Sequence, residues 1–234
     1  MALRLYVDAA LSTGLDIDLP PGPARHAQVR RTQPGDALVL FNGLGGEWAA
    51  EVLRMGRQQV QVRVGAHHAV DREAAAAITI AMGMPANERM DTLVEKATEL
   101  GAAAIQPLLT ARSVLRLGGE RADRKREHWQ GVAVAAAEQC GRTRVPAIAA
   151  VRGLADWLPG APPGARWVLS PEAGHPPVWP EGPLTVLSGP EGGFGADELA
   201  MARRAGFLPV GLGPRVLRAD TAPLVVLAWA LAGR

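Results

Sequence analysis

The pattern of apolar and polar residues changes near residue 70. Before that point, short apolar segments at 4–7, 37–41, 47–53 and 60–64 are separated by turn residues such as Pro34-Gly35 and Asn42-Gly43. In the last segment Val60, Val62 and Val64 alternate with polar residues, as in a strand with one buried face. Short strands joined by turns predict a small β-barrel over residues 1–72.

From residue 73 on, apolar strand segments alternate with longer helical segments. We expect strands at 78–82, 105–109, 167–169, 185–187 and 208–212, and helices at 88–100 and 123–140 that end at Gly101 and Gly141. This alternation is typical of a parallel sheet with helices packed on it. The sequence therefore predicts an α/β fold with a second domain over residues 73–234.

The last predicted helix, 224–231, is apolar on nearly every side. Such a helix has to be buried all round, either in one core or partly against a second subunit. The apolar run that contains it falls short of the roughly 20 residues that a membrane helix needs. We therefore expect no membrane association.

Glycine-rich segments follow two of the predicted strands, at 187–195 and 211–222. Glycine allows the backbone to approach a ligand closely and to adopt positive φ. The chain has no Gly-x-x-x-x-Gly-Lys-Ser/Thr motif, and Val216 stands where a dinucleotide fingerprint would have its third glycine. The two glycine-rich loops therefore match neither of these known phosphate-binding motifs, but their close backbone approach suits a nucleotide-like cofactor.

The chain is basic because it is rich in arginine, and this richness has two possible causes. The net charge is +2 and the pI is about 9.2, with 23 Arg and only 2 Lys. Arginine pairs bidentately with phosphate and stacks on bases, which favours RNA as a partner. A GC-rich genome would also enrich arginine, so position matters more than number.

The cysteine, the N-terminal segment and the histidines of the chain argue against several classes of protein. A single cysteine, Cys140, allows no internal disulfide, and the N-terminus lacks the apolar stretch of a signal peptide, so we expect a cytoplasmic protein. The five histidines lack the spacing of a zinc site, and no metal is expected.

Several motifs together resemble one family. The chain contains Gly189-Pro190-Glu191-Gly192-Gly193-Phe194 and Leu212-Gly213-Pro214-Arg215-Val216-Leu217-Arg218, and upstream Asn87-Glu88-Arg89-Met90, Arg112-Ser113-Val114 and Ala136-Ala137-Glu138-Gln139-Cys140-Gly141-Arg142. These segments, spread over nearly the whole chain, resemble the RsmE-type 16S ribosomal RNA uridine-N3 methyltransferases of the SPOUT superfamily. The resemblance implies a PUA-like RNA-binding barrel, a SPOUT α/β domain with a deep trefoil knot, a homodimer, and S-adenosylmethionine as cofactor.

The same resemblance implies which residues hold the cofactor. The loops near 169–172, 189–194 and 212–218 would converge on one pocket, where backbone groups and apolar side chains hold the adenine. The expected cofactor-binding residues are Leu169, Leu187, Gly189, Glu191, Gly192, Leu212, Gly213 and Leu217.

The expected substrate is N3 of a uridine in 16S rRNA of the small ribosomal subunit, and its chemistry sets the catalytic requirements. Removal of the N3 proton leaves an anion spread over two carbonyl oxygens, which Arg218 and Arg112 are placed to stabilise. Asp220 stands where the family commonly has Glu, and it has three open roles: capping the helix, orienting Arg218 or accepting the proton.

RNA contacts are expected from Arg31, Arg112, Arg142 and Arg218. The pattern around Arg31 departs from the family, because His26 is followed by a segment one residue shorter, with Arg30 in place of a leucine. Two alternative functions stay open: a SPOUT tRNA ribose 2′-O-methyltransferase, and a non-catalytic RNA-binding ribosome assembly factor. Binding of S-adenosylmethionine would separate the last of these from an enzyme.

Overall fold

The computed structural model describes residues 2–57, 59–174 and 178–232. The chain folds as two compact units. The first comprises Met1–Glu73 and Ala137–Val145, and the second comprises Ala74–Ala136 and Pro146–Arg234. The sequence pattern had placed 137–145 with the rest of the second domain, and the boundaries 1–72 and 73–234 stay predictions for the functional domains.

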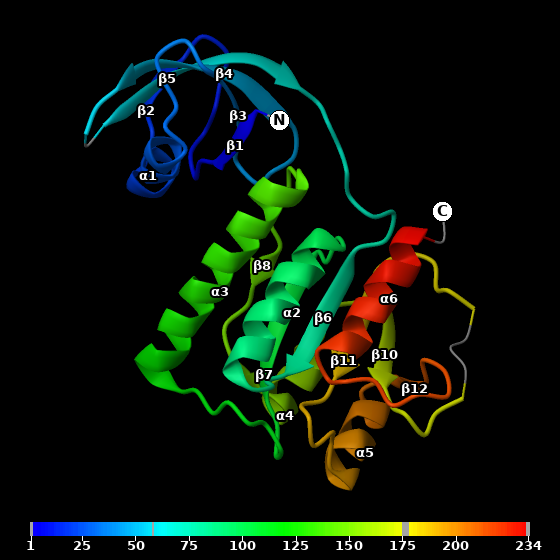
Figure 1. Ribbon diagram of the computed structural model, residues 1–234. Coiled ribbons are helices and arrows are strands. Elements are labelled where there is room, and N and C mark those ends of the chain that lie inside the picture. The colour runs from blue at the N-terminus through cyan, green and yellow to red at the C-terminus, as the bar shows by residue number, and fades with distance from the viewer. Residues whose placement is uncertain (1, 58, 175–177, 233–234) are drawn as a thin grey trace. The chain divides into compact units, whose positions relative to one another are not determined.

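A five-stranded sheet forms the first unit, in the order β1-β3-β4-β5-β2 (Figure 1). Its strands are β1 (Leu3–Tyr6), β2 (Asp16–Asp18), β3 (Ala37–Phe41), β4 (Glu47–Met55) and β5 (Val60–His68). The pair β1–β3 is parallel and the other pairs are antiparallel. Four of these strands match segments predicted from the sequence, and the short edge strand β2 was missed.

Alternation along β5 builds the core of this unit. Val60, Val62 and Val64 are fully buried, and they pack with Leu5, Leu38 and Leu40 from the neighbouring strands. The helix α1 (Pro21–Val29) was not predicted, because Pro20-Pro21-Gly22-Pro23 reads as a loop. Proline in the first helical turn costs no hydrogen bond, since the N–H groups there have no helical partner anyway.

The second unit contains a parallel sheet in the order β12-β10-β11-β6-β7-β8, with β9 also pairing with β7. Its strands are β6 (Ile78–Gly83), β7 (Ala104–Leu109), β8 (Ala147–Ile148), β9 (Arg152–Gly153), β10 (Ala165–Leu169), β11 (Leu184–Ser188) and β12 (Leu208–Val210). All of the recorded pairs are parallel. The predicted α/β class is confirmed.

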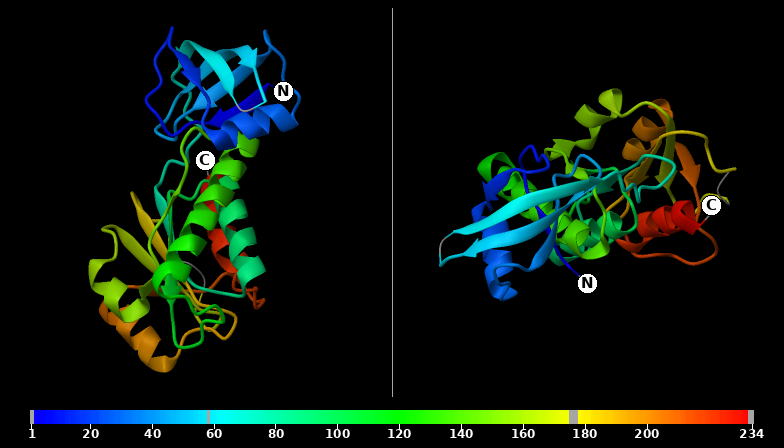
Figure 2. Two further views of the ribbon diagram at one scale, coloured as in Figure 1. Left: turned by 90° about the vertical axis from the view of Figure 1, so that its left-hand side faces the viewer. Right: turned by 90° about the horizontal axis from the view of Figure 1, so that it is seen from above.

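Helices cover both faces of this sheet. Figures 1 and 2 show α2 (Asn87–Glu99) and α6 (Thr221–Ala232) side by side on one face, and α4 (Leu154–Trp157) and α5 (Ala196–Arg204) on the other. On the second face Trp157 and Phe207 pack with Leu187 and Val168 of the strands. A longer helix, α3 (Gly119–Cys140), contributes Trp129 to the buried set.

The single chain does not bury α6 all round, so of the two predicted alternatives only burial partly against a second subunit stays a prediction. Val226 and Leu227 are fully buried, but Val225 is 38% exposed and Trp229 is 37% exposed. No helix in the described part of the chain is long and apolar enough to cross a membrane. The helix thus presents an apolar stripe that the chain covers only in part.

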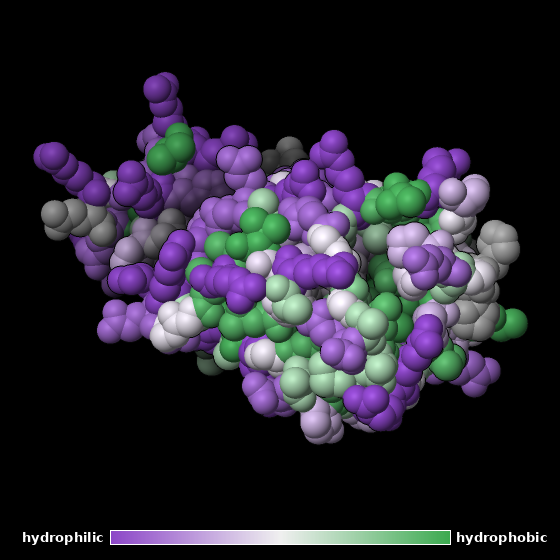
Figure 3. Space-filling view, turned by 90° about the horizontal axis from the view of Figure 1, so that it is seen from below, coloured by the Kyte–Doolittle hydropathy of each residue, from purple (hydrophilic) through white to green (hydrophobic). Residues whose placement is uncertain are grey.

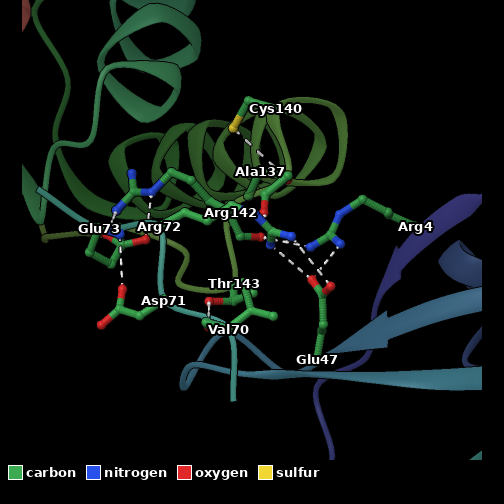
Figure 4. Close-up of polar contacts among 11 residues, drawn as sticks. Arg4, Glu47, Val70, Asp71, Arg72, Glu73, Ala137, Cys140, Arg142 and Thr143 are labelled. Atoms are coloured by element: carbon green, nitrogen blue, oxygen red, sulfur yellow. Dashed lines mark hydrogen bonds and ion pairs between the residues drawn. The ribbon is translucent and has the colours of Figure 1, made fainter. Parts of the chain in front are cut away.

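A network of charged side chains ties 137–145 to the sheet of the first unit (Figure 4). The guanidinium group of Arg142, 4% exposed, forms an ion pair with Glu73. The Glu47 carboxylate lies 2.6 Å from Arg4 Nη1 and 3.0 Å from Arg72 Nη1, and the same Arg72 atom donates to the Gly141 carbonyl at 2.8 Å. Burial alone would raise the pKa of Glu47, but hydrogen bonds from Arg72 and Arg4 together outweigh it and hold that pKa below its ordinary value.

This network predicts a pH-dependent stability. Glu47→Gln removes the charge between two guanidinium groups and should lower the free energy of unfolding by about 1–3 kcal/mol at pH 7. Because the folded-state pKa is depressed, the contribution exists above the ordinary value of 4.5 and is lost as the pH falls below it. Denaturant titrations of the native and variant chains should therefore converge at acid pH.

The control is Glu51→Gln on the same strand, because Glu51 is exposed and forms no ion pair among the described residues. This variant should keep the native stability. Equal losses in the two variants would contradict the structural role of Glu47.

Candidate active site

A cavity of about 320 Å³ opens at the carboxyl ends of β10, β11 and β12. Its lining comes mainly from the three loops that follow these strands. They run from Leu169 to Glu172 after β10, from Ser188 to Phe194 after β11, and from Val210 to Ala219 after β12. In open parallel sheets this edge is where ligands bind. Figure 3 looks onto the side to which β6 points in Figure 1, and there hydrophobic side chains lie in small patches between hydrophilic ones.

Most of the predicted cofactor-binding residues meet at this cavity. Its lining includes Leu169, Gly189, Glu191, Leu212, Gly213 and Leu217. Two others do not line it: Leu187 is fully buried in the core under α4 and α5, and Gly192 lies beside Arg112. A ligand contact by any of these residues stays a prediction.

Glycine is required where the loops come together. A Cβ on Gly189 would lie 3.2 Å from the backbone of Gly193 and 3.3 Å from Phe194 Cδ2. A Cβ on Gly83, at the end of β6, would lie 2.7 Å from Pro190 Cδ. Gly213 has φ +101°, a conformation that side chains rarely adopt. The shape of the cavity therefore depends on positions without side chains.

Two buried or half-buried carboxylates hold the loop after β11. Glu191 Oε1 accepts a hydrogen bond from the Ala86 N–H at 3.0 Å and lies 3.4 Å from Arg89 Nη1. Glu198, 8% exposed, accepts the N–H groups of Ala111 and Gly195 at 2.8 Å each. In the second contact the N3 residue Glu198 caps the backbone N–H of the N-cap residue Gly195 at the start of α5, which is one half of a capping box.

The predicted catalytic residues lie at the edge of the cavity rather than in its lining. Arg112 Nη1 donates to the Gly192 carbonyl at 2.7 Å, which places this guanidinium beside the loop after β11. Arg218 is exposed, and it lies between Leu217 and Ala219, which line the cavity. Asp220 Oδ1 is buried and has no hydrogen-bond partner among the described residues. Arg218 and Asp220 thus follow β12, and Arg112, which follows β7, contacts the loop after β11.

The other predicted RNA contacts lie in the first unit. Arg31 is exposed and has φ 56°, and Arg142 is buried in its ion pair with Glu73. The structure therefore gives Arg142 a role in folding, because its guanidinium group is already engaged. RNA contact by either arginine stays a prediction.

Sequence reasoning missed the lining residues Ser188 and Leu199. Phe194 lies in the predicted pocket loop 189–194, although it was not among the expected cofactor-binding residues. The backbone N–H groups of Leu212, Gly213 and Leu217 donate to no other group in the described ranges. They are available to a ligand with acceptor atoms, such as a purine ring.

Comparison with known proteins agrees with this geometry. A family model described as an RNA methyltransferase domain matches residues 72–231, and one described as an RNA methyltransferase PUA domain matches residues 24–65. The chain belongs to this RNA methyltransferase family. The prediction of the family from its motifs is confirmed.

Relatives of the same family match almost end to end. The ribosomal RNA small subunit methyltransferase E of Mycobacterium bovis is 35% identical over 97% of this chain and 90% of its own length. The enzyme of that name from Synechocystis is 33% identical over 97% of this chain and 77% of its own length. The structure of ribosomal RNA small subunit methyltransferase E from Neisseria gonorrhoeae, bound to S-adenosyl methionine, has a TM-score of 0.92 at 31% identity and covers 97% of this chain and 96% of that one.

In this RNA methyltransferase the described residues include no group of three His, Cys, Asp or Glu side chains that could hold a metal ion. His175, one of the five histidines in the sequence, lies outside the described residues. The chemistry of the site thus has to be argued from its arginines, its carboxylates and its backbone.

The capping contact of Glu198 gives a stability test of the site. Glu198→Ala removes two hydrogen bonds and leaves the N–H groups of Ala111 and Gly195 without that acceptor, so the free energy of unfolding should fall by about 2–4 kcal/mol. Denaturant titration measures the loss. Asp197→Ala is the matched control, because Asp197 is exposed in the same helical turn and should cost less than about 1 kcal/mol. A Glu198 loss no larger than the Asp197 loss would show that the capping contact does not hold the loop.

Proposed function

We propose that this chain transfers a methyl group from S-adenosylmethionine to N3 of a uridine in 16S rRNA of the small ribosomal subunit. One observation carries the proposal: the glycine loops that define the family motif build the cavity at the carboxyl ends of the parallel strands. Support comes from end-to-end relatives named ribosomal RNA small subunit methyltransferase E and from a neighbour of that name bound to S-adenosyl methionine.

The residues of the cavity fit this cofactor. Its volume of about 320 Å³ falls within the usual range of small-molecule sites. Leu212, Leu217 and Phe194 supply apolar surface for a purine ring. The N–H groups of Leu212 and Leu217, which donate to no group among the described residues, supply donors for ring nitrogens. When bound, S-adenosylmethionine supplies an electrophilic methyl group on a positively charged sulfur.

Arginine side chains provide what the nucleophile needs. Uracil N3 carries a weakly acidic proton, and its loss places negative charge on the two flanking carbonyl oxygens. Arg218 and Arg112 lie at the edge of the cavity, and their guanidinium groups donate hydrogen bonds to these oxygens or to the adjacent phosphate. Because the arginines stabilise the anion, they lower the pKa of uracil N3, and the proton is lost more easily.

Asp220 is the carboxylate best placed to receive that proton or to orient Arg218. Its buried Oδ1 makes no hydrogen bond in the described residues, so this oxygen is available as an acceptor. The N–H groups of Thr221 and Ala222 donate to the Arg218 carbonyl at 3.0 Å each, which fixes the turn that carries both residues.

The proposal includes an assembly. The exposed apolar stripe of α6, with Val225, Ala228 and Trp229, suits a homodimer interface, because isolated chains rarely leave such a helix face uncovered. We place the protein in the cytoplasm with the small ribosomal subunit as its partner. The trefoil knot belongs to the same proposal, as a property of the superfamily that the chain resembles.

Methyl transfer tests the proposal directly. The purified chain, labelled S-adenosylmethionine and small subunits lacking the modification should yield 3-methyluridine, identified by mass spectrometry of digested RNA. Arg218→Ala should lower the rate by about 10²–10³-fold, as expected for the loss of a donor to a developing oxyanion. Arg204→Ala, which removes an exposed arginine on α5 outside the cavity lining, should leave the rate unchanged.

Two results would overturn this function. Label recovered only as a 2′-O-methyl nucleoside would make the chain a ribose methyltransferase. No label, and no rise in melting temperature with S-adenosylmethionine, would favour a non-catalytic assembly factor, because a bound cofactor stabilises the folded state by mass action.

The dimer is tested by Val225→Glu. A carboxylate on the apolar stripe of α6 should shift the mass measured by sedimentation equilibrium from dimer to monomer. Leu208→Glu is the control, because Leu208 is 58% exposed on β12 rather than on α6. Dimers that persist in Val225→Glu and dissociate in the control would contradict an α6 interface.

A further inference from the structure

An aromatic pair lies at one end of the sheet in the first unit. Trp48 of β4 and His67 of β5 are cross-strand partners, and their ring centroids are 4.5 Å apart at an angle of 45°. Trp48 is half-buried against the core, whereas His67 is exposed. The core thus anchors the indole, and the imidazole beside it faces solvent.

A glycine turn joins this pair to an arginine. Gly45 and Gly46 both have positive φ, +102° and +71°. A Cβ on Gly46 would lie 2.3 Å from His67 Nε2, and a Cβ on Gly45 would lie 3.0 Å from Arg144 Nη2. Consecutive glycines are therefore in contact with the imidazole and with the guanidinium, so both groups border the same turn.

Arg144 keeps its charge available. It is exposed, and it forms no ion pair within the described ranges of the chain. A backbone bridge between Leu44 and Arg144, and the Gly45 N–H donated to the Thr143 carbonyl at 3.2 Å, fix this residue against the turn. The guanidinium is thus held in place by the backbone without being neutralised.

The nearest acid on the strand does not offset this charge. Glu47 precedes Trp48, but its carboxylate is engaged by Arg4 and Arg72. Arg4, Arg72 and Arg144 together carry three positive charges against the one negative charge of Glu47, so the net charge near the turn is positive.

We propose that Trp48, His67 and Arg144 form a platform that binds one nucleotide of single-stranded RNA, with the aromatic pair against the base and the guanidinium on the phosphate. The proposal rests on the proposed function, because it assigns part of the RNA substrate to the first unit. Aromatic stacking and a phosphate-binding cation are the usual elements of single-strand recognition. An unpaired base is required, because in a duplex its face is covered by the neighbouring base pairs.

RNA affinity of the full-length chain tests the platform. The probe is a fluorescent 12-nucleotide poly(U) RNA, and anisotropy gives the Kd at several salt concentrations. Arg144→Gln should weaken binding about five- to tenfold and reduce the slope of log Kd against log salt by about 0.7, the value for one phosphate contact on a single strand. His67→Ala should weaken binding about fivefold at every salt concentration, because stacking is insensitive to salt.

Arg54→Gln is the matched control. Arg54 is exposed on the same strand, roughly 20 Å from Trp48 at about 3.3 Å per residue, and its loss changes the net charge equally. It should change the Kd less than twofold. Unchanged melting temperatures of all variants would show that the sheet remains folded.

The outcomes distinguish the platform from the proposed function. Equal Kd values for Arg144→Gln, His67→Ala and Arg54→Gln in a chain that still forms 3-methyluridine would overturn the platform alone. An unsubstituted chain that binds the probe but transfers no methyl group would overturn the proposed function. In that case, a weaker affinity for the probe in Arg144→Gln and His67→Ala but not in Arg54→Gln would still support the platform. A salt slope equally reduced in Arg144→Gln and Arg54→Gln would show diffuse charge and would also overturn the platform.

Discussion

The cavity depends on loops that approach one another more closely than side chains allow. A Cβ on Gly211 would lie 2.2 Å from the Ala173 carbonyl oxygen, and one on Gly83 would lie 2.7 Å from Pro190 Cδ. Real Cβ contacts are essentially never this short, so these backbones meet only because the positions are glycine. The exposed backbone donors, the apolar lining and the placement of Arg112 and Arg218 all follow from that close approach.

Carboxylates hold these loops where glycines let them meet. Glu198 joins the turn after β7 to the start of α5, and Glu191 joins the loop after β11 to the start of α2. In the first unit Glu47 and Glu73 do the same with arginines. Glu191 and Glu198 therefore accept backbone N–H groups, whereas Glu47 and Glu73 pair with arginine side chains.

Much of the fold was predictable because its strands carry clear patterns. The alternation of Val60, Val62 and Val64, and the apolar run at 78–82, gave β5 and β6 correctly. The helix α1 was missed because three prolines surround its start. A local signal typical of a turn was there the first turn of a helix.

The motifs predicted which loops line the cavity, but the sequence did not predict which individual side chains face it. Leu212, Gly213 and Leu217 line the cavity as the resemblance implied, but Leu187 lies in the core, because alternate residues of a strand point to opposite faces of the sheet. The burial of Arg142 was not predictable, since its partner Glu73 is far away in the sequence. The Trp48–His67–Arg144 platform likewise depends on strand pairing that no local pattern reveals.

Calorimetric titration with S-adenosylmethionine tests the central claim most directly, comparing the unsubstituted chain with Gly211→Val. We expect one cofactor per chain, and at least a tenfold weaker affinity in the variant, because the branched side chain would force apart the loops after β10 and β12. Binding of equal strength in both chains, or no binding by the unsubstituted chain, would contradict a cofactor site that depends on the close approach of these loops.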